Sequence, residues 1–189
     1  PLPRLQLALA LPLGVEGEGE WMDLEFVEPV DAMQVMERWQ QTLPPGLHLI
    51  SAEPVPVSSP SLAQQLQSSR WRFVLSTGEQ SPGTDATLWS QAITDLLAQN
   101  ELIWEDTDKK GRPRRRDLRG LLRELHLLHW TVASPGSGGC SVELELLAAI
   151  DPQGRSLKPA QLQLWLSHQL GSKLSLSRVR RVELTLVQC

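Results

Sequence analysis

The 189-residue chain has few of the residues from which cross-links, metal centres and membrane spans are built. Cys140 and Cys189 are its only cysteines, too few for a disulfide framework or a four-thiolate metal site, which suits a reducing cytoplasm. No apolar run approaches the roughly 20 residues of a membrane helix, and no cationic segment of a signal peptide precedes Leu5. No catalytic signature occurs either. These absences predict a soluble, cytoplasmic protein that by itself binds no metal, cluster or cofactor.

The composition is close to the globular average, with 41% hydrophobic and 21% charged residues, but the charge is unevenly distributed. Residues 1–108 contain 16 Asp and Glu against 4 Lys and Arg, a net charge of −12. Residues 109–189 contain 6 against 14, a net charge of +8, which leaves the overall charge of −4. The N-terminal part of the chain is therefore acidic and the C-terminal part is basic.

Residues 1–60 show the pattern of two strands, a helix and a third strand. Apolar periodicity places these elements, in chain order, at 5–11, 21–27, 31–43 and 47–57. The first two strands are expected to pair as a hairpin across a Gly- and Glu-rich turn. Asp31 is the expected helix cap, whereas Pro54 and Pro56 fit a strand at the edge of a sheet.

Residues 70–189 show the order strand, helix, strand, strand, helix, strand. The expected strands are 71–75, 101–105, 142–147 and 174–187, and the expected helices are 84–98 and 159–170. Thr84 or Asp85 is expected to cap the first helix, and Gly171 to end the second. A hairpin tip is expected at 109–116, and residues 118–129 suit a short helix and a strand nearly equally.

The second order is that of a ferredoxin-like split βαβ unit, and the first is the same unit without its opening strand and helix. We therefore expect an α+β fold of two ferredoxin-like halves: an incomplete half at 1–60, a connector at 61–69 and a complete half at 70–189. Because the first half lacks its opening elements, we also expect an exposed apolar surface beside Leu5 to Leu11.

The strongest local charge signal is a run of eight basic residues within fifteen positions, opposed there only by Asp117. Its members are Lys109, Lys110, Arg112, Arg114, Arg115, Arg116, Arg119 and Arg123. Basic residues at a hairpin tip can neutralise several phosphates, and arginine adds bidentate geometry. The run therefore predicts a nucleic-acid contact. Docking to an acidic protein surface and a solvated loop are the alternatives.

Several carboxylates also lie close together: Glu16, Glu18, Glu20, Asp23 and Glu25. Paired carboxylates can do acid–base or metal chemistry when their environments separate their pKa values. Their alternation with glycines favours a solvated turn instead. Glu143 and Glu145, two apart in an expected strand, indicate its solvent face.

The four histidines and Cys140 give weaker evidence for a catalytic or metal site. His126 and His129 are three apart, a spacing that on a helix could direct two imidazoles toward one metal, but no third ligand lies nearby. His48 and His168 are remote in sequence. Cys140 follows two glycines without an identifiable His or Asn partner, so we do not interpret it as a nucleophile.

The segment LPLGVEGEGEWMDLE at 11–25, followed by LPPGL at 43–47, resembles the radical-SAM-linked family of uncharacterised proteins. Members are encoded beside a radical SAM enzyme or fused to its C-terminal end. They usually carry an N-terminal strand and helix that this sequence does not show. The resemblance implies no enzymatic activity, and the chain lacks the three-cysteine cluster motif. An iron–sulfur cluster and S-adenosylmethionine would therefore belong to the radical SAM partner.

These observations predict a non-catalytic accessory domain that recognises the substrate, RNA, of a radical SAM enzyme in cis or in trans. The alternative is a protein–protein docking module for that enzyme, without nucleic-acid contact, in which the acidic front and basic back serve assembly. A third interpretation is a hydrolase or RNA-cleaving enzyme that uses His126 or His129. We expect no catalysis by this chain alone.

Overall fold

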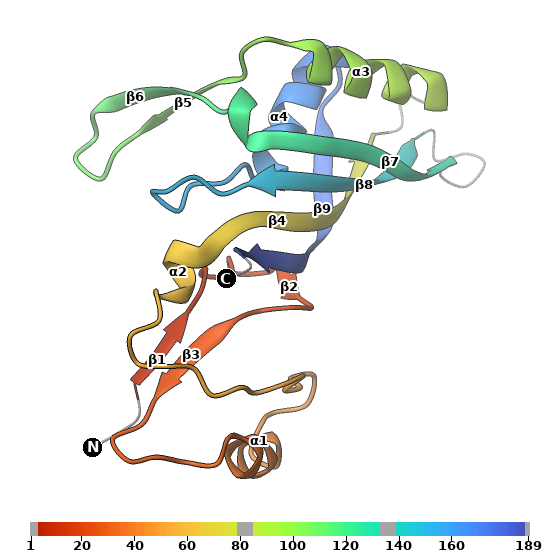
Figure 1. The fold of residues 1–189 in the computed structure, drawn as a ribbon. Coiled ribbons are helices and arrows are strands. Elements are labelled where there is room, and N and C mark those ends of the chain that lie inside the picture. The colour runs from red at the N-terminus through yellow and green to blue at the C-terminus, as the bar shows by residue number, and fades with distance from the viewer. Residues whose placement is uncertain (1–3, 79–84, 133–138, 188–189) are drawn as a thin grey trace.

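The computed structural model describes residues 4–78, 85–132 and 139–187 of a mixed α+β chain, centred on a five-stranded sheet (Figure 1). In spatial order the strands are β2 (Glu16–Gly17), β9 (Leu174–Leu186), β4 (Leu66–Thr77), β8 (Cys140–Ala149) and β7 (Leu122–Val132). Neighbouring strands are antiparallel, except that β2 runs parallel to β9. The long strand β4 is therefore the centre of the sheet.

Two helices, α3 (Ala86–Ala98) and α4 (Pro159–Gln169), cover one face of this sheet (Figure 1). The carboxylate of Asp85 accepts a hydrogen bond from the Thr87 N–H and caps α3, while Pro159 occupies the first turn of α4, where its missing N–H is not needed. Gly171 has φ +58°, the left-handed conformation that ends a helix. Both helices confirm the sequence-based prediction; Thr84 lies outside the described residues.

The main core lies between these helices and the sheet, because alternate residues of the central strands point to that side. Trp71, Phe73 and Leu75 of β4 are buried there, together with Trp89 of α3 and Leu166 of α4. Each such side chain stabilises the fold by about 1.5–3 kcal/mol relative to an exposed position. This part of the chain therefore has a core of its own.

A separate two-stranded sheet, β5 (Ile103–Thr107) and β6 (Pro113–Asp117), forms a hairpin that extends away from the large sheet (Figure 1). It confirms the hairpin expected near 109–116. The short 3-10 helix η1 (Arg119–Leu121) then leads into β7. The sequence suited helix and strand nearly equally over residues 118–129. In the structure this segment is one short turn followed by a strand.

Residues 4–57, which we call the N-terminal arm, lie beside the β2 end of the sheet (Figure 1). Strand β1 (Arg4–Leu7) pairs antiparallel with β3 (Met22–Glu25), which confirms the expected pairing with shorter strands. Helix α1 (Ala32–Gln40) follows its cap, Asp31, and the short helix α2 (Leu62–Gln65) leads from the arm into β4. Ala8 is the only buried residue of the arm.

The strand predicted over 47–57 is wrong, because these residues form no strand. The side-chain amide of Gln40 accepts a hydrogen bond from the Leu49 N–H at 2.7 Å and donates one to the Leu47 carbonyl at 3.3 Å, as a neighbouring strand would. Pro54 and Pro56 supply no N–H to a ladder. The arm therefore lacks the last strand of the expected incomplete half, and β2 joins the large sheet instead.

Candidate functional sites

The basic run lies mainly on β6, where the antiparallel register places it against acidic residues of β5. Asp106 is directly opposite Arg114, and Glu105 is opposite Arg115. The Arg114 Nε donates a hydrogen bond to Asp106 at 3.0 Å, Arg115 lies 3.6 Å from Glu105, and Arg116 also contacts the Asp106 carboxylate. Three of the eight predicted nucleic-acid contacts are therefore ion-paired between β5 and β6.

The pKa of Asp106 reflects this pairing. Partial burial raises it, but the hydrogen bond and charge of Arg114, together with those of Arg116, hold the pKa below its ordinary value. A phosphate that bound either arginine would first have to displace this carboxylate. Arg114 and Arg116 are therefore weaker candidates for phosphate contact than the sequence indicates.

Arg112 belongs to the hairpin turn. The carboxylate of Asp108 accepts hydrogen bonds from the Arg112 N–H and, at 2.7 Å, from its Nε, across a turn in which Gly111 has φ +76°. The same D-x-x-G-R arrangement recurs between β8 and α4, where Asp151 holds Arg155 in the same way. Arg155 is not part of the basic run, so the Asp–Arg pairing is a feature of this turn. The pairing accounts for the presence of Arg112 without a bound ligand.

Arg119 has a structural role at the end of α3. Its guanidinium donates hydrogen bonds to the carbonyls of Leu97 at 2.7 Å, Gln99 at 2.8 Å and Leu122 at 3.0 Å. The last carbonyls of a helix have no partner within the helix, and a cation there is favourable. Arg119 therefore joins the end of α3 to the start of β7.

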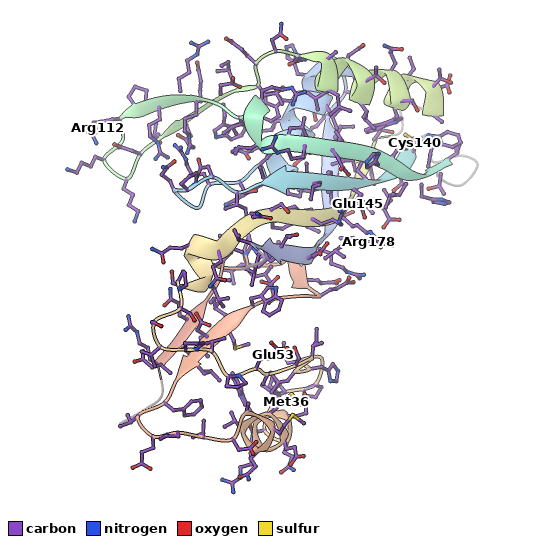
Figure 2. All side chains as sticks on the ribbon, viewed as in Figure 1. Met36, Glu53, Arg112, Cys140, Glu145 and Arg178 are labelled. Carbon is purple, nitrogen blue, oxygen red and sulfur yellow. The ribbon has the colours of Figure 1, made fainter. Side chains whose placement is uncertain are left out.

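Lys109, Lys110 and Arg123 are exposed and make no ion pair within residues 4–78, 85–132 and 139–187. The two lysines lie at the tip of the hairpin, which Arg112 marks in Figure 2, whereas Arg123 lies on β7. These three are therefore the members of the basic run that have no acidic partner in the described part of the chain, and the eight-residue nucleic-acid site stays a prediction.

A second charged cluster, which sequence reasoning missed, joins the arm to β9. Arg181 is only 1% exposed; it pairs with Glu20 and donates a hydrogen bond to the Leu9 carbonyl at 2.8 Å. Its guanidinium carbon lies 5.4 Å from the ring centroid of Trp71, within the range of a cation–π contact. The adjacent Arg180–Arg181 pair in an expected strand was the only sequence signal. Arg181 thus holds the arm against the sheet.

Arg180, next to it, is partly exposed and contacts Glu16 at 2.8 Å and Glu18 at 2.6 Å. Hydrogen bonding and charge from Glu16, then the charge of Glu18, hold the pKa of Arg180 above its ordinary value. Glu16 and Glu18 are exposed in the turn region before β3, as predicted, but the sequence did not show that these carboxylates and Glu20 pair with the arginines of β9. The other two candidate carboxylates lie on β3.

Glu145 and Glu143 share the face of the sheet opposite the helices, but the Glu145 side chain is only 12% exposed, so the predicted solvent face is confirmed only in part. Glu145 accepts hydrogen bonds from Arg72 Nε at 2.8 Å and from an Arg70 terminal nitrogen at 2.9 Å. Burial raises the pKa of Glu145, but these two arginines outweigh burial and hold it below its ordinary value. The arrangement is typical of a structural ion pair rather than of a general acid.

His126 and His129 lie on β7, opposite Glu145 and Glu143 in the register, and not on a helix. In the part of the chain that the structure describes, no group of three or more His, Cys, Asp or Glu could hold a metal ion. Cys140 is buried in β8, with its N–H bonded to Thr77; Cys189 lies outside the described residues.

The arm also exposes many apolar side chains, which we call the apolar surface. Sixteen large hydrophobic side chains are strongly exposed among the described residues, and eleven belong to the arm: Leu5, Leu7, Leu13, Trp21, Val27, Val30, Met33, Leu47, Ile50, Val55 and Val57. Leu5 and Leu7 are about half exposed, as expected for this segment. Single exposed apolar side chains are normal in folded proteins, and the feature of the arm is their number.

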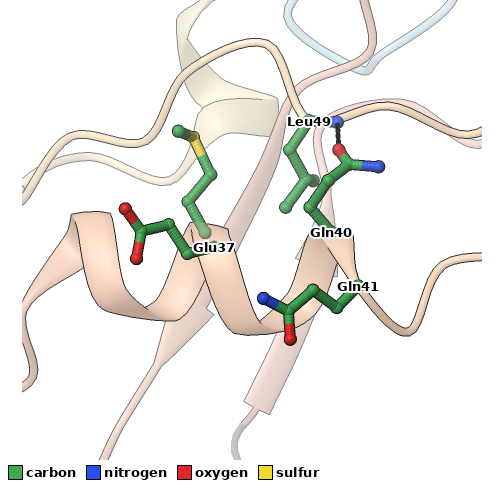
Figure 3. A pocket seen from close by; sticks show the side chains of 5 residues that line it. Glu37, Gln40, Gln41 and Leu49 are labelled. Atoms are coloured by element: carbon green, nitrogen blue, oxygen red, sulfur yellow. Dashed lines mark hydrogen bonds between the residues drawn. The ribbon is translucent and has the colours of Figure 1, made fainter.

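A hollow of about 360 Å³ lies in the arm between α1 and the segment that follows it (Figure 3). Met36 and Leu49 supply its apolar lining, and Glu37, Gln40 and Gln41 complete it. The hydrogen bond from the Leu49 N–H to Gln40 ties the facing segment to the helix (Figure 3).

No helix of the described residues is long and apolar enough to cross a membrane. A comparison with the curated proteins found no match. The model of a bacterial family, described as "Uncharacterized protein conserved in bacteria (DUF2344)", matches residues 1–159. The matched stretch includes the arm, the hairpin and strands β4, β7 and β8. Because the match spans well over half of the chain, the protein belongs to this bacterial family.

Proposed function

We propose that the chain is a non-catalytic docking domain of a radical SAM enzyme, in cis or in trans, and that the arm holds the enzyme. The observation that carries this proposal is the apolar surface, where eleven large side chains of 54 residues meet solvent while only Ala8 is buried. Burying such side chains against a partner is the main favourable term in protein association. The iron–sulfur cluster and S-adenosylmethionine belong to the partner.

Calorimetric titration with a radical SAM enzyme, the proposed partner, tests the docking function. We expect binding, and we expect Leu5→Ser with Val27→Ser to weaken it at least about tenfold, since each substitution removes roughly 1.5 kcal/mol or more of apolar burial. Leu128→Ser with Leu164→Ser, two exposed positions outside the arm, is the matched control. Absence of binding by the wild type, or equal weakening by the control, would refute the proposal.

Recognition of RNA as the enzyme's substrate is the second candidate function. It is favoured by the hairpin, which extends from the sheet and presents Lys109 and Lys110 without an acidic partner in the described residues. Changing both lysines to Ala should reduce the log–log salt slope of RNA affinity by about 1.4, at roughly 0.7 per phosphate contact. The control variant is Lys158→Ala with Lys173→Ala, which has the same net charge as the hairpin variant. An unchanged slope would show that the hairpin tip does not contact RNA phosphates.

We also propose that residues 66–187 form a ferredoxin-like unit. Without the β5–β6 hairpin, the element order is β4, α3, β7, β8, α4, β9, and the spatial order β9-β4-β8-β7 with antiparallel neighbours supports this assignment. A solved structure of this region in which α3 and α4 lie on opposite faces of the sheet would contradict it.

A further inference from the structure

We propose that the hollow beside α1 binds an apolar side chain from a basic segment of the partner protein, a proposal that rests on the docking function above for its partner. Met36 and Leu49 line the hollow, and Met33, Leu47 and Ile50 are exposed near it on the same two segments by 55–77%. Interfaces take most of their energy from a few apolar anchors seated in such pockets. The hollow therefore supplies the anchoring point of the larger apolar surface.

The wall of the hollow is fixed before any partner arrives. Gln40 bonds both to the Leu49 N–H and to the Leu47 carbonyl, so the segment facing α1 is held by two hydrogen bonds. Asp31 caps the other end of α1 through the Met33 N–H at 2.8 Å. A pocket that is already formed spares the partner the entropy of ordering it.

The charge of residues 28–57, which include the hollow, favours a basic partner. Residues 28–57 contain four carboxylates, Glu28, Asp31, Glu37 and Glu53, but only one Lys or Arg, Arg38. Asp31 caps α1, whereas the three glutamates are exposed and have no ion pair in the described residues; Glu37 lines the hollow itself. Figure 2 labels Met36 and Glu53 in this part of the arm. Carboxylates repel nucleic acid and anionic lipid, whereas a lysine- or arginine-rich segment complements them.

The three methionines of the chain provide an internal measurement. Met33 and Met36 lie on α1, whereas Met22 lies on β3. The whole chain is labelled with methyl-¹³C methionine, and the three signals are assigned by Met→Leu variants. A 14-residue amphipathic peptide of leucine and lysine is then added as the ligand. We expect this peptide to shift the Met33 and Met36 methyl signals and to leave Met22 unchanged.

A leucine–glutamate peptide of the same pattern is the control. Glu37→Lys should weaken binding of the leucine–lysine peptide about tenfold, because it reverses the charge at the hollow. Equal shifts of all three signals, no shift at millimolar peptide, or equal binding of the leucine–glutamate peptide would overturn the proposal.

Titration of the same variant with the radical SAM enzyme separates this proposal from the docking function. If the enzyme binds the wild type and Glu37→Lys equally, the hollow is not the anchor although docking stands. If the enzyme does not bind but the leucine–lysine peptide shifts Met33 and Met36, the docking function falls and the site stands, with another basic protein as its partner.

Discussion

The N-terminal arm and the sheet that follows it are ordered by different means. Residues 66–187 bury a continuous set of large side chains between sheet and helices, whereas the arm buries only Ala8. The arm is attached near β2 and β3 by Arg181, which binds Glu20, and by the Trp21 Nε1, which donates to the Leu184 carbonyl at 3.1 Å. The sheet region is held by its own core, while the arm depends on a few contacts at one end and leaves its apolar groups for a partner.

The largest expected effect separates the two regions directly. Leu144→Ala, at a fully buried position in β8, should lower the free energy of unfolding by about 3–5 kcal/mol, since it leaves a cavity in the core. Leu5→Ala in the arm, at a half-exposed position, should change it by less than about 0.5 kcal/mol. Urea unfolding measures both. Comparable losses would show that the arm has a core of its own.

The second-largest loss of unfolding free energy is expected at Arg181, where the arm is attached to the sheet. Arg181→Ala leaves Glu20 and the Leu9 carbonyl without their partner in a largely buried site, which should cost about 3 kcal/mol. Arg180→Ala removes only exposed pairs and should lower the free energy of unfolding much less, because exposed ion pairs are screened by solvent.

Hydrogen exchange should localise the change. We expect Arg181→Ala to accelerate amide exchange in residues 8–21 before it does so in β8. The double variant Glu20→Leu with Arg181→Met should recover most of the stability, because it removes both members of the pair. Unchanged exchange in the arm would mean that Arg181 does not hold it.

Within the basic run, the structure predicts a smaller difference between neighbouring arginines. Arg119→Ala removes hydrogen bonds to three carbonyls and should cost about 1–2 kcal/mol, measured by urea unfolding. Arg115→Ala, in an exposed pair with Glu105, should cost less than about 0.5 kcal/mol. A larger loss for Arg115 would contradict the structural assignment of Arg119.

The smallest effect is a pH dependence from Glu145. Its folded-state pKa lies below the ordinary 4.5, so the unfolded chain binds the proton first as the pH falls. Its contribution to stability is therefore present above about pH 4.5 and is lost as the pH falls through the folded-state pKa. Glu145→Gln should flatten this part of the curve of unfolding free energy against pH. Glu143→Gln, on the same face but without an arginine pair in the described residues, is the matched control.

Features fixed by neighbouring residues could be predicted from the sequence. The periodicity of α3, its Asp85 cap and Gly171 after α4 are all local signals, and all three were correct. The strand expected over 47–57 was wrong because the Gln40 side chain satisfies the backbone there. The division into 1–60, 61–69 and 70–189 stays a prediction, although β4 already begins at Leu66.

The candidate sites depended on pairings that a sequence window does not contain. The window from Lys109 to Arg123 excluded Glu105 and Asp106, which the register of the hairpin brings opposite the arginines. The charge division between the front and the back of the chain is also partly neutralised inside the molecule, as the pair of Glu16 and Arg180 shows. A run of one sign can therefore be half of an intramolecular pair, and its partner is found only from the fold.

The position of β2 beside β9 constrains how the chain acquires its fold during synthesis. The hydrogen-bonded pair Arg180 and Glu16 is separated by 164 residues, so the arm leaves the ribosome long before β9. At roughly 5–20 residues per second, that delay is about 10–30 s. Throughout it Glu16, Glu18 and Glu20 have no arginine from β9. Attachment of the arm is therefore a late, long-range step of folding, and a nascent chain would offer the apolar surface to chaperones or to its partner before the sheet is complete.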